Sequence, residues 1–229
     1  MISGRAGGTS PNSGVLRGDS HRSVRGAGRF RPSGPPPGPA LPSRHPATNL
    51  ETWRSHSYWR RIGSKLHAGY GGICAYSCHW IPYDTGADTV EHFRPKDTYP
   101  AEAYEWANYR LVCATLNGRK GAYEDVLDPF QIENGWFVID FPSMLVKPSS
   151  LLAPGGRQDV QATIDRLGLN DEGTCLKSRV RWLTDYCLDD ITLDYLRKHA
   201  PFIVAELERQ DLVATIREVF NVCGYSMEG

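Results

Sequence analysis

The side chains with the clearest chemical potential lie close together in one stretch of this 229-residue chain. Glu91 and His92 are adjacent, Asn108 follows 16 residues after the histidine, and Asn117 comes 9 residues later. Carboxylate and amide oxygens are ligands for hard divalent cations, and a histidine with a pKa of about 6.5 accepts protons at neutral pH. Taken singly these residues carry little weight, because Asn117-Gly118 is also a good turn pair. Because they fall together in one short stretch, we treat them as candidate site residues.

Short strands and a helix must position these residues. Residues 89–93 and 109–113 are β-prone runs joined by a proline-containing loop, and Asn117 falls at a strand-to-helix junction soon after the second run. Side chains alternate between the two faces of a strand, so Glu91 and His92 are expected on opposite faces.

Four motifs in order carry a resemblance to a known family. They are ICAYSC at 73–78, EHFRPK at 91–96, W.N at 106–108 and N..KG at 117–121. The sequence resembles the HNH endonuclease family in its His-Asn-Asn form, over roughly residues 60 to 135. Within that family it is most similar to HNH proteins found with retrons and as the nuclease subunit of Septu-type bacterial defence systems.

The resemblance implies a ββα-metal hairpin that hydrolyses phosphodiester bonds. Glu91 and Asn117 match the positions of the metal ligands, and their oxygen donors suit one Mg²⁺ or Mn²⁺ ion. His92 matches the general base that takes a proton from the attacking water. Asn108 matches the central asparagine, whose amide ties the active-site loop together.

The resemblance also implies partners. We expect a nucleic-acid substrate, DNA rather than RNA, and an ATPase is a possible partner protein by family analogy. Four basic residues flank the motifs and are expected to hold the phosphates beside the scissile one: Arg94, Lys96, Arg119 and Lys120.

The sequence departs from its relatives at their structural zinc site. Relatives often carry two CxxC knuckles, whereas Ser77 and Leu116 stand here where the second thiolates would be. A closed zinc site needs four nitrogen or sulfur ligands, so we expect no structural zinc and expect Leu116 to pack with nearby cysteines in place of the metal. The alternative is a rearranged zinc site built from Cys74, Cys78, His79 and Cys113.

The first 48 residues differ in kind from the rest. They hold seven Arg, no Lys and one acid, and nine Gly, eight Pro and seven Ser make up half of them. Such a segment has almost nothing to bury, so we expect a disordered tail. It is open whether the tail is a basic arm for nucleic acid, a targeting peptide, or sequence translated from a start codon placed too early.

The remaining chain predicts an α+β fold with a ββα-metal core and flanking helices. A helix is expected over 49–66, a strand over 136–141, and helices after Pro154, where apolar residues recur with period 3.6. We divide the chain into the tail (1–48), the nuclease core (49–135), and a hairpin with a helical end (136–229).

Composition bounds the remaining possibilities. The chain has no run of about 20 apolar residues, which a spanning helix needs, and no apolar signal core. Its six cysteines are scattered, so reduced thiols in a cytoplasmic protein without a membrane partner are expected. The rival interpretation is a degenerate HNH module that binds nucleic acid or an ATPase without cutting, because residues 49–229 carry a net charge of about −6 and the zinc thiolates are lost.

Overall fold

The computed structural model of the protein describes residues 62–82 and 88–222. The predicted tail and most of the predicted helix at 49–66 therefore lie outside the described residues. The helices and strands of the described part are α2 (Gly63–Gly69), β1 (Asp88–His92), η3 (Pro100–Glu102), η4 (Trp106–Asn108), β2 (Tyr109–Cys113), α3 (Ala114–Lys120), β3 (Phe137–Asp140), β4 (Leu145–Pro148), α4 (Pro154–Leu167), η5 (Glu172–Leu176), α5 (Lys177–Cys187), α6 (Leu193–His199), α7 (Pro201–Arg209) and α8 (Ile216–Val222).

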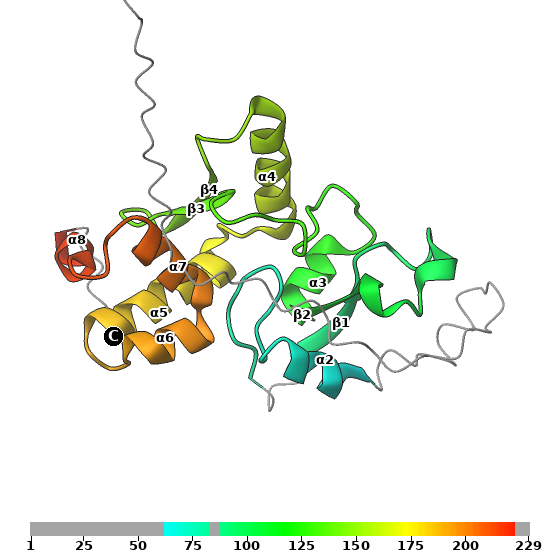
Figure 1. Ribbon diagram of the computed structural model, residues 1–229, viewed down its shortest axis with the longest axis horizontal. Helices are drawn as coiled ribbons and strands as arrows, with labels where there is room; N and C mark the ends of the chain where they lie inside the picture. Colours follow the sequence, from blue (N-terminus) through cyan, green and yellow to red (C-terminus); the bar gives the residue numbers. More distant parts are fainter. Residues whose placement is uncertain (1–61, 83–87, 223–229) are drawn as a thin grey trace, which may run out of the picture.

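An antiparallel hairpin followed at once by a helix lies at the centre of the region that carries the motifs. β1 pairs with β2 from Asp88 opposite Cys113 to His92 opposite Tyr109. No loop separates β2 from α3, which packs against both strands. α3 ends at Gly121, whose φ of 50° is easily adopted only by glycine. Figure 1 shows α2 on one side of this hairpin and α3 on the other.

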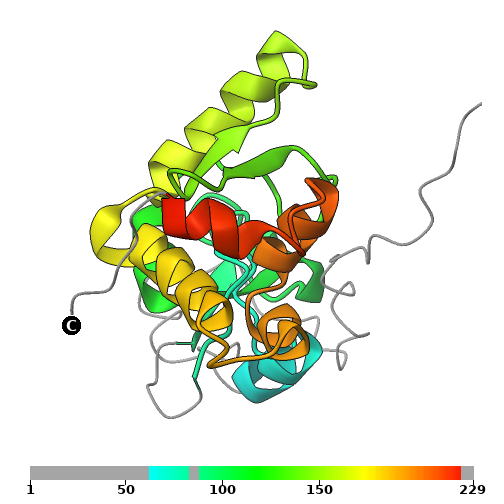
Figure 2. The same cartoon turned by 90° about the vertical axis from the view of Figure 1, so that its left-hand side faces the viewer.

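A second hairpin follows, as the sequence predicted. β3 and β4 pair antiparallel with Phe137 opposite Pro148, and the strand is shorter than the expected 136–141. β4 packs on α4 and β3 on α7. In Figure 2 the N-terminal part of α4 projects beyond the rest of the molecule.

The C-terminal part is helical, which confirms the period-3.6 interpretation in its main features. Val160, Ile164 and Leu167 are buried on one face of α4. The same apolar spacing after Pro201 groups Leu212 with Ile216 and Val219 and so predicts a helix through Leu212, which is wrong at that residue, because α7 ends at Arg209 and α8 begins only at Ile216. Leu212 instead lies in the turn between these two helices.

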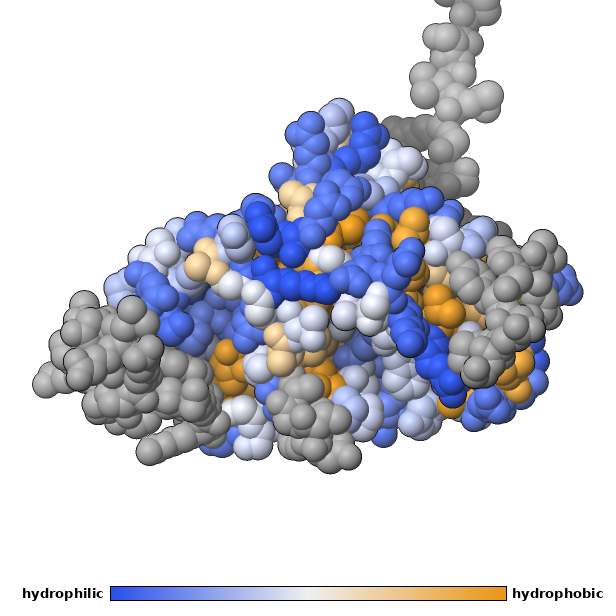
Figure 3. Space-filling view, turned by 180° about the vertical axis from the view of Figure 1, so that it is seen from behind, coloured by the Kyte–Doolittle hydropathy of each residue, from blue (hydrophilic) through white to orange (hydrophobic). Residues whose placement is uncertain are grey.

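One hydrophobic core contains residues from both the expected nuclease core (49–135) and the expected C-terminal part (136–229). It includes Leu66, Leu111 and Leu116 from the first part and Ile164 and Ile203 from the second. The described residues thus form a mixed structure of helices and small antiparallel sheets, which confirms the α+β class. Figure 3 shows hydrophilic residues over much of the back face, with apolar residues between them.

None of the helices within residues 62–82 and 88–222 is both long and apolar enough to cross a membrane.

Candidate functional site

Strand β1 and helix α3 face each other through two pairs of side chains. Residues two apart on a strand share a face, and residues three apart on a helix lie one turn from each other. Thr89 and Glu91 therefore face Asn117 and Lys120. The Asn117 amide donates to the Thr89 hydroxyl at 2.9 Å, and the Lys120 ammonium lies 2.7 Å from Glu91 Oε1.

The Glu91–Lys120 pair is almost completely buried, with side-chain exposures of 2% and 0%. Burial raises the pKa of the Glu91 carboxyl, and the neighbouring Lys120 charge opposes that rise. Lys120 Nζ also donates to the backbone carbonyls of His92 at 3.3 Å and Phe93 at 2.9 Å. The second carboxylate oxygen, Glu91 Oε2, is buried without a hydrogen-bond partner. It is the acceptor that this pair leaves unsatisfied.

His92 points to the opposite face of β1, as the alternation predicted. Its Nε2 lies 3.0 Å from the carbonyl oxygen of Ala103. A carbonyl only accepts, so Nε2 carries the hydrogen and Nδ1 is the basic nitrogen of the neutral ring. Burial lowers the pKa of His92 to about 4, against the hydrogen bond to Ala103, which favours the charged form. The imidazole is therefore neutral at pH 7.

Tyr109 supports the same arrangement and was not singled out from the sequence. Its hydroxyl donates to the Ala103 carbonyl at 2.9 Å, and its ring meets the His92 ring edge to face with centroids 5.2 Å apart. Tyr109 is fully buried and lies opposite His92 in the hairpin register. The expected runs at 89–93 and 109–113, paired end to end, would have placed Phe93 rather than His92 opposite Tyr109, so the sequence did not indicate this contact.

Asn108 braces the loop between the strands with its amide. Its Oδ1 accepts from the Arg94 backbone N–H at 2.7 Å, and its Nδ2 donates to the carbonyls of Arg94 at 3.0 Å and Glu102 at 3.2 Å. Its own carbonyl accepts from Phe93 N–H at 2.9 Å. The loop held in this way carries the Ala103 carbonyl that orients His92.

The four basic residues expected to contact phosphates divide into two groups. Arg94 has an exposed side chain that pairs with Glu102 at 2.5 Å and lies over the Tyr99 ring, and Lys96 is partly exposed. The other two are engaged within the protein.

Arg119 and Lys120 were expected to contact phosphates, but in this structure both side chains have partners within the protein. Arg119 donates to the carbonyls of Leu167 and Gly168, where α4 ends and its last carbonyls lack helical partners, and it pairs with Asp171. Lys120 is buried against Glu91. Contact with phosphates stays a prediction for all four residues.

The residues at the positions of the relatives' zinc site pack closely against one another. Leu116 and Cys74 are completely buried, Cys113 is partly buried, and the Cys113 backbone N–H lies 3.4 Å from Cys74 Sγ. Buried His79 meets the Ser178 hydroxyl at 2.9 Å through Nδ1. Among the residues that the structure describes, no three His, Cys, Asp or Glu side chains form a group that could hold a metal.

The expected two-residue ligand set is only partly brought together. Glu91 and Asn117 lie on facing elements but contact different partners, Lys120 and Thr89. The unpartnered Glu91 Oε2 is an acceptor that a cation would satisfy. A donor set of one carboxylate and one amide oxygen suits a hard divalent ion whose other ligands are water and phosphate oxygens. The donor types of the two residues suit such an ion, while Glu91 is paired with Lys120 in this structure.

Comparison with known proteins shows a likeness over part of the chain. The chain is 37% identical over 81 residues to the Septu protein PtuB of Bacillus thuringiensis, and this match covers 35% of the chain and 30% of that protein. No model of a protein family matches the chain. The likeness to a Septu protein agrees with the Septu-type part of the resemblance stated from the motifs.

Proposed function

We propose that this protein is a metal-dependent endonuclease that cleaves nucleic acid, DNA in the first place, in bacterial defence against phage. The observation that carries the proposal is the arrangement at the end of β1. A neutral histidine is held by a backbone carbonyl on one face, and a carboxylate with one unpartnered oxygen lies on the other. The likeness to a Septu protein supports the defence context.

In this proposal the side chains divide the reaction between them. Glu91 and Asn117 hold the ion, and Mg²⁺ or Mn²⁺ at that position supplies positive charge that stabilises the phosphate and the leaving oxygen in the transition state. His92 accepts a proton from the attacking water at Nδ1 while the Ala103 carbonyl fixes its Nε2–H. Arg94 and Lys96 bind the neighbouring phosphates.

The remaining residues of the site act through others. Asn108 holds the loop that carries Ala103, and Tyr109 donates to the same carbonyl as His92. Both are positioning residues. An ATPase partner belongs to the proposal only through the resemblance of the motifs to Septu-type nucleases.

The test is a cleavage assay with purified full-length protein on plasmid DNA, single-stranded DNA and RNA. We expect cleavage in Mg²⁺ or Mn²⁺ that EDTA stops. Glu91→Gln is expected to remove it, whereas Glu218→Gln, which changes an exposed carboxylate on α8, is expected to leave it unchanged. Equal cleavage by wild type and Glu91→Gln contradicts the metal assignment.

The burial of Glu91 against Lys120 favours a second candidate, a module that binds nucleic acid without cutting. A carboxylate that is 2% exposed and already paired with a cation is not directly offered to a metal ion. This candidate predicts binding of the same nucleic acids with no cleavage in either metal, and the same assay with a gel-shift measurement separates the two.

A further inference from the structure

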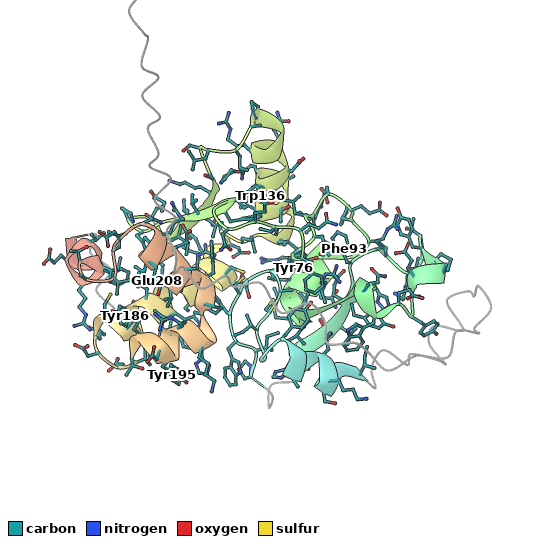
Figure 4. All side chains as sticks on the ribbon, viewed as in Figure 1. Tyr76, Phe93, Trp136, Tyr186, Tyr195 and Glu208 are labelled. Atoms are coloured by element: carbon teal, nitrogen blue, oxygen red, sulfur yellow. The ribbon has the colours of Figure 1, made fainter. Side chains whose placement is uncertain are left out.

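The Lys120 ammonium sits in a cage of oxygen atoms. Glu91 Oε1 lies 2.7 Å from Nζ, and the carbonyl oxygens of His92 and Phe93 lie at 3.3 and 2.9 Å. The Phe93 ring closes another side, with its centroid 5.6 Å from the nitrogen, and Figure 4 labels Phe93 beside α3. The side chain has no exposed surface. Lysine is rarely buried this completely unless it is paired.

The chemistry of this cage is that of a site for a hard cation. Carboxylate and backbone carbonyl oxygens are the groups with which proteins bind such ions. The ammonium uses one oxygen of Glu91, and the other oxygen has no partner. Asn117 lies one helical turn before Lys120 and contacts Thr89, the neighbour of Glu91 on the same strand face. Asn117 and Lys120 therefore face the same side of β1, Asn117 at Thr89 and the Lys120 ammonium at Glu91 and the carbonyls that follow it.

We propose that Lys120 is the resident cation of Glu91 and that a divalent ion displaces it. This inference rests on the proposed function, since it takes Glu91 as the metal ligand. A divalent ion and an ammonium on one buried carboxylate repel each other strongly in a medium of low dielectric constant. One cation therefore replaces the other, and the carboxylate keeps a counter-charge throughout.

The exchange accounts for two roles expected from the sequence, metal binding by Glu91 and phosphate binding by Lys120. Glu91 binds the metal only after Lys120 leaves, and Lys120, once released, extends from the end of α3 toward the phosphates of the substrate. Metal affinity is lowered by the cost of moving the lysine. The pair thereby keeps the carboxylate neutralised when the divalent ion is scarce.

Lys120→Met tests this exchange by a measurement that does not depend on cleavage. Methionine keeps the aliphatic packing and removes the ammonium, so Glu91 is left buried without a counter-charge and the melting temperature is expected to fall by about 10 °C. Adding Mn²⁺ is expected to restore most of this loss. The same addition should shift the wild type much less, because there the ion must displace the lysine.

The double variant Glu91→Gln/Lys120→Met is the matched control. It has neither charge, so its melting temperature should lie closer to the wild-type value and should not respond to Mn²⁺. An equal Mn²⁺ shift in wild type and Lys120→Met, or an equal response of the double variant, overturns the inference.

A second measurement uses the wild-type protein, in case Lys120→Met does not fold. Lysine acetylation by an activated ester, followed by mass spectrometry, reports how accessible each ammonium is. Lys120 is expected to be protected without metal and to react several-fold faster with Mn²⁺, whereas exposed Lys177 should react equally in both. Unchanged protection of Lys120 at saturating Mn²⁺ overturns the inference.

The two proposals fail differently. If the wild type cuts nucleic acid but Mn²⁺ neither rescues Lys120→Met nor exposes Lys120, the exchange is wrong and the nuclease assignment stands. If Mn²⁺ does both but no nucleic acid is cut, the cation site is real and the nuclease assignment is wrong.

Discussion

His92 and Tyr109 bind the same carbonyl oxygen, that of Ala103, from opposite strands of one hairpin. The two rings also meet edge to face. The imidazole is thus held at one nitrogen by a backbone acceptor and along its edge by an aromatic ring. In the proposed mechanism this imidazole is the general base, and its position depends on residues that do not contact the substrate.

Tyr109→Phe is expected to slow cleavage several-fold with little change in KM. The variant keeps the ring contact and removes the hydroxyl that shares the Ala103 carbonyl with His92. Loss of that hydrogen bond should also lower the free energy of unfolding by about 1 kcal/mol. Steady-state kinetics and urea denaturation measure both effects. Tyr123→Phe, at an exposed position, is the control, and a kcat for Tyr109→Phe equal to the control value argues against positioning through Tyr109.

Asn108→Asp should impair both the loop and the reaction. Aspartate can still accept from the Arg94 N–H but cannot donate to the carbonyls of Arg94 and Glu102, and it places a charge beside them. We expect a loss of stability of about 1 to 3 kcal/mol and a fall in kcat larger than that of Tyr109→Phe. Unaltered stability would mean that the amide does not brace the loop.

Leu116→Ala should cost about 2 to 5 kcal/mol of unfolding free energy, because the side chain is completely buried and its removal leaves a cavity. Cys78→Ser should be milder. A zinc site made from the nearby cysteines and His79 predicts the reverse order, since one lost ligand releases the metal and its folding energy. Elemental analysis decides the point: about one zinc per chain, lost in Cys78→Ser, refutes the prediction of a zinc-free packing.

Acid should destabilise the protein through His79. Burial, assisted by the Arg179 charge, lowers the pKa of this histidine to about 3, so between that value and about 6.5 the unfolded chain binds the proton and the folded chain does not. Stability is then complete above the unfolded pKa and falls as the pH drops below it. From pH 7 to pH 5 the contribution lost is about 2 kcal/mol.

Urea denaturation of wild type and His79→Gln at several pH values measures this contribution. The variant should be less stable at pH 7 but should show a flatter decline toward pH 5. Parallel curves for the two proteins would show that His79 does not titrate as its burial requires.

The sequence predicted the local elements of the site well because each depends on neighbouring residues. The run at Tyr109–Cys113 is β2 as predicted, and alternation along β1 placed Glu91 and His92 on opposite faces. The apolar spacing that placed Leu212 in a helix was misleading, because a turn followed by a short helix can show the same spacing as one longer helix.

Contacts between segments that are far apart in the chain could not be predicted from the sequence. From the sequence, Lys120 was expected to bind a phosphate of the substrate. In the structure it pairs with Glu91, because α3 packs directly on β1. Arg119 donates a hydrogen bond to the Leu167 carbonyl at the end of α4, 48 residues away in the chain. No local pattern could indicate that the partners of these two cations lie inside the protein.

The most direct test of the account is the cleavage rate of His92→Ala in Mn²⁺, measured beside the wild type at equal concentration. Circular dichroism and a gel shift establish that the variant is folded and still binds nucleic acid. Removal of a general base should lower the rate by about 10² to 10⁴-fold. Cleavage by folded His92→Ala at the wild-type rate would contradict the role of His92 and the mechanism built on it.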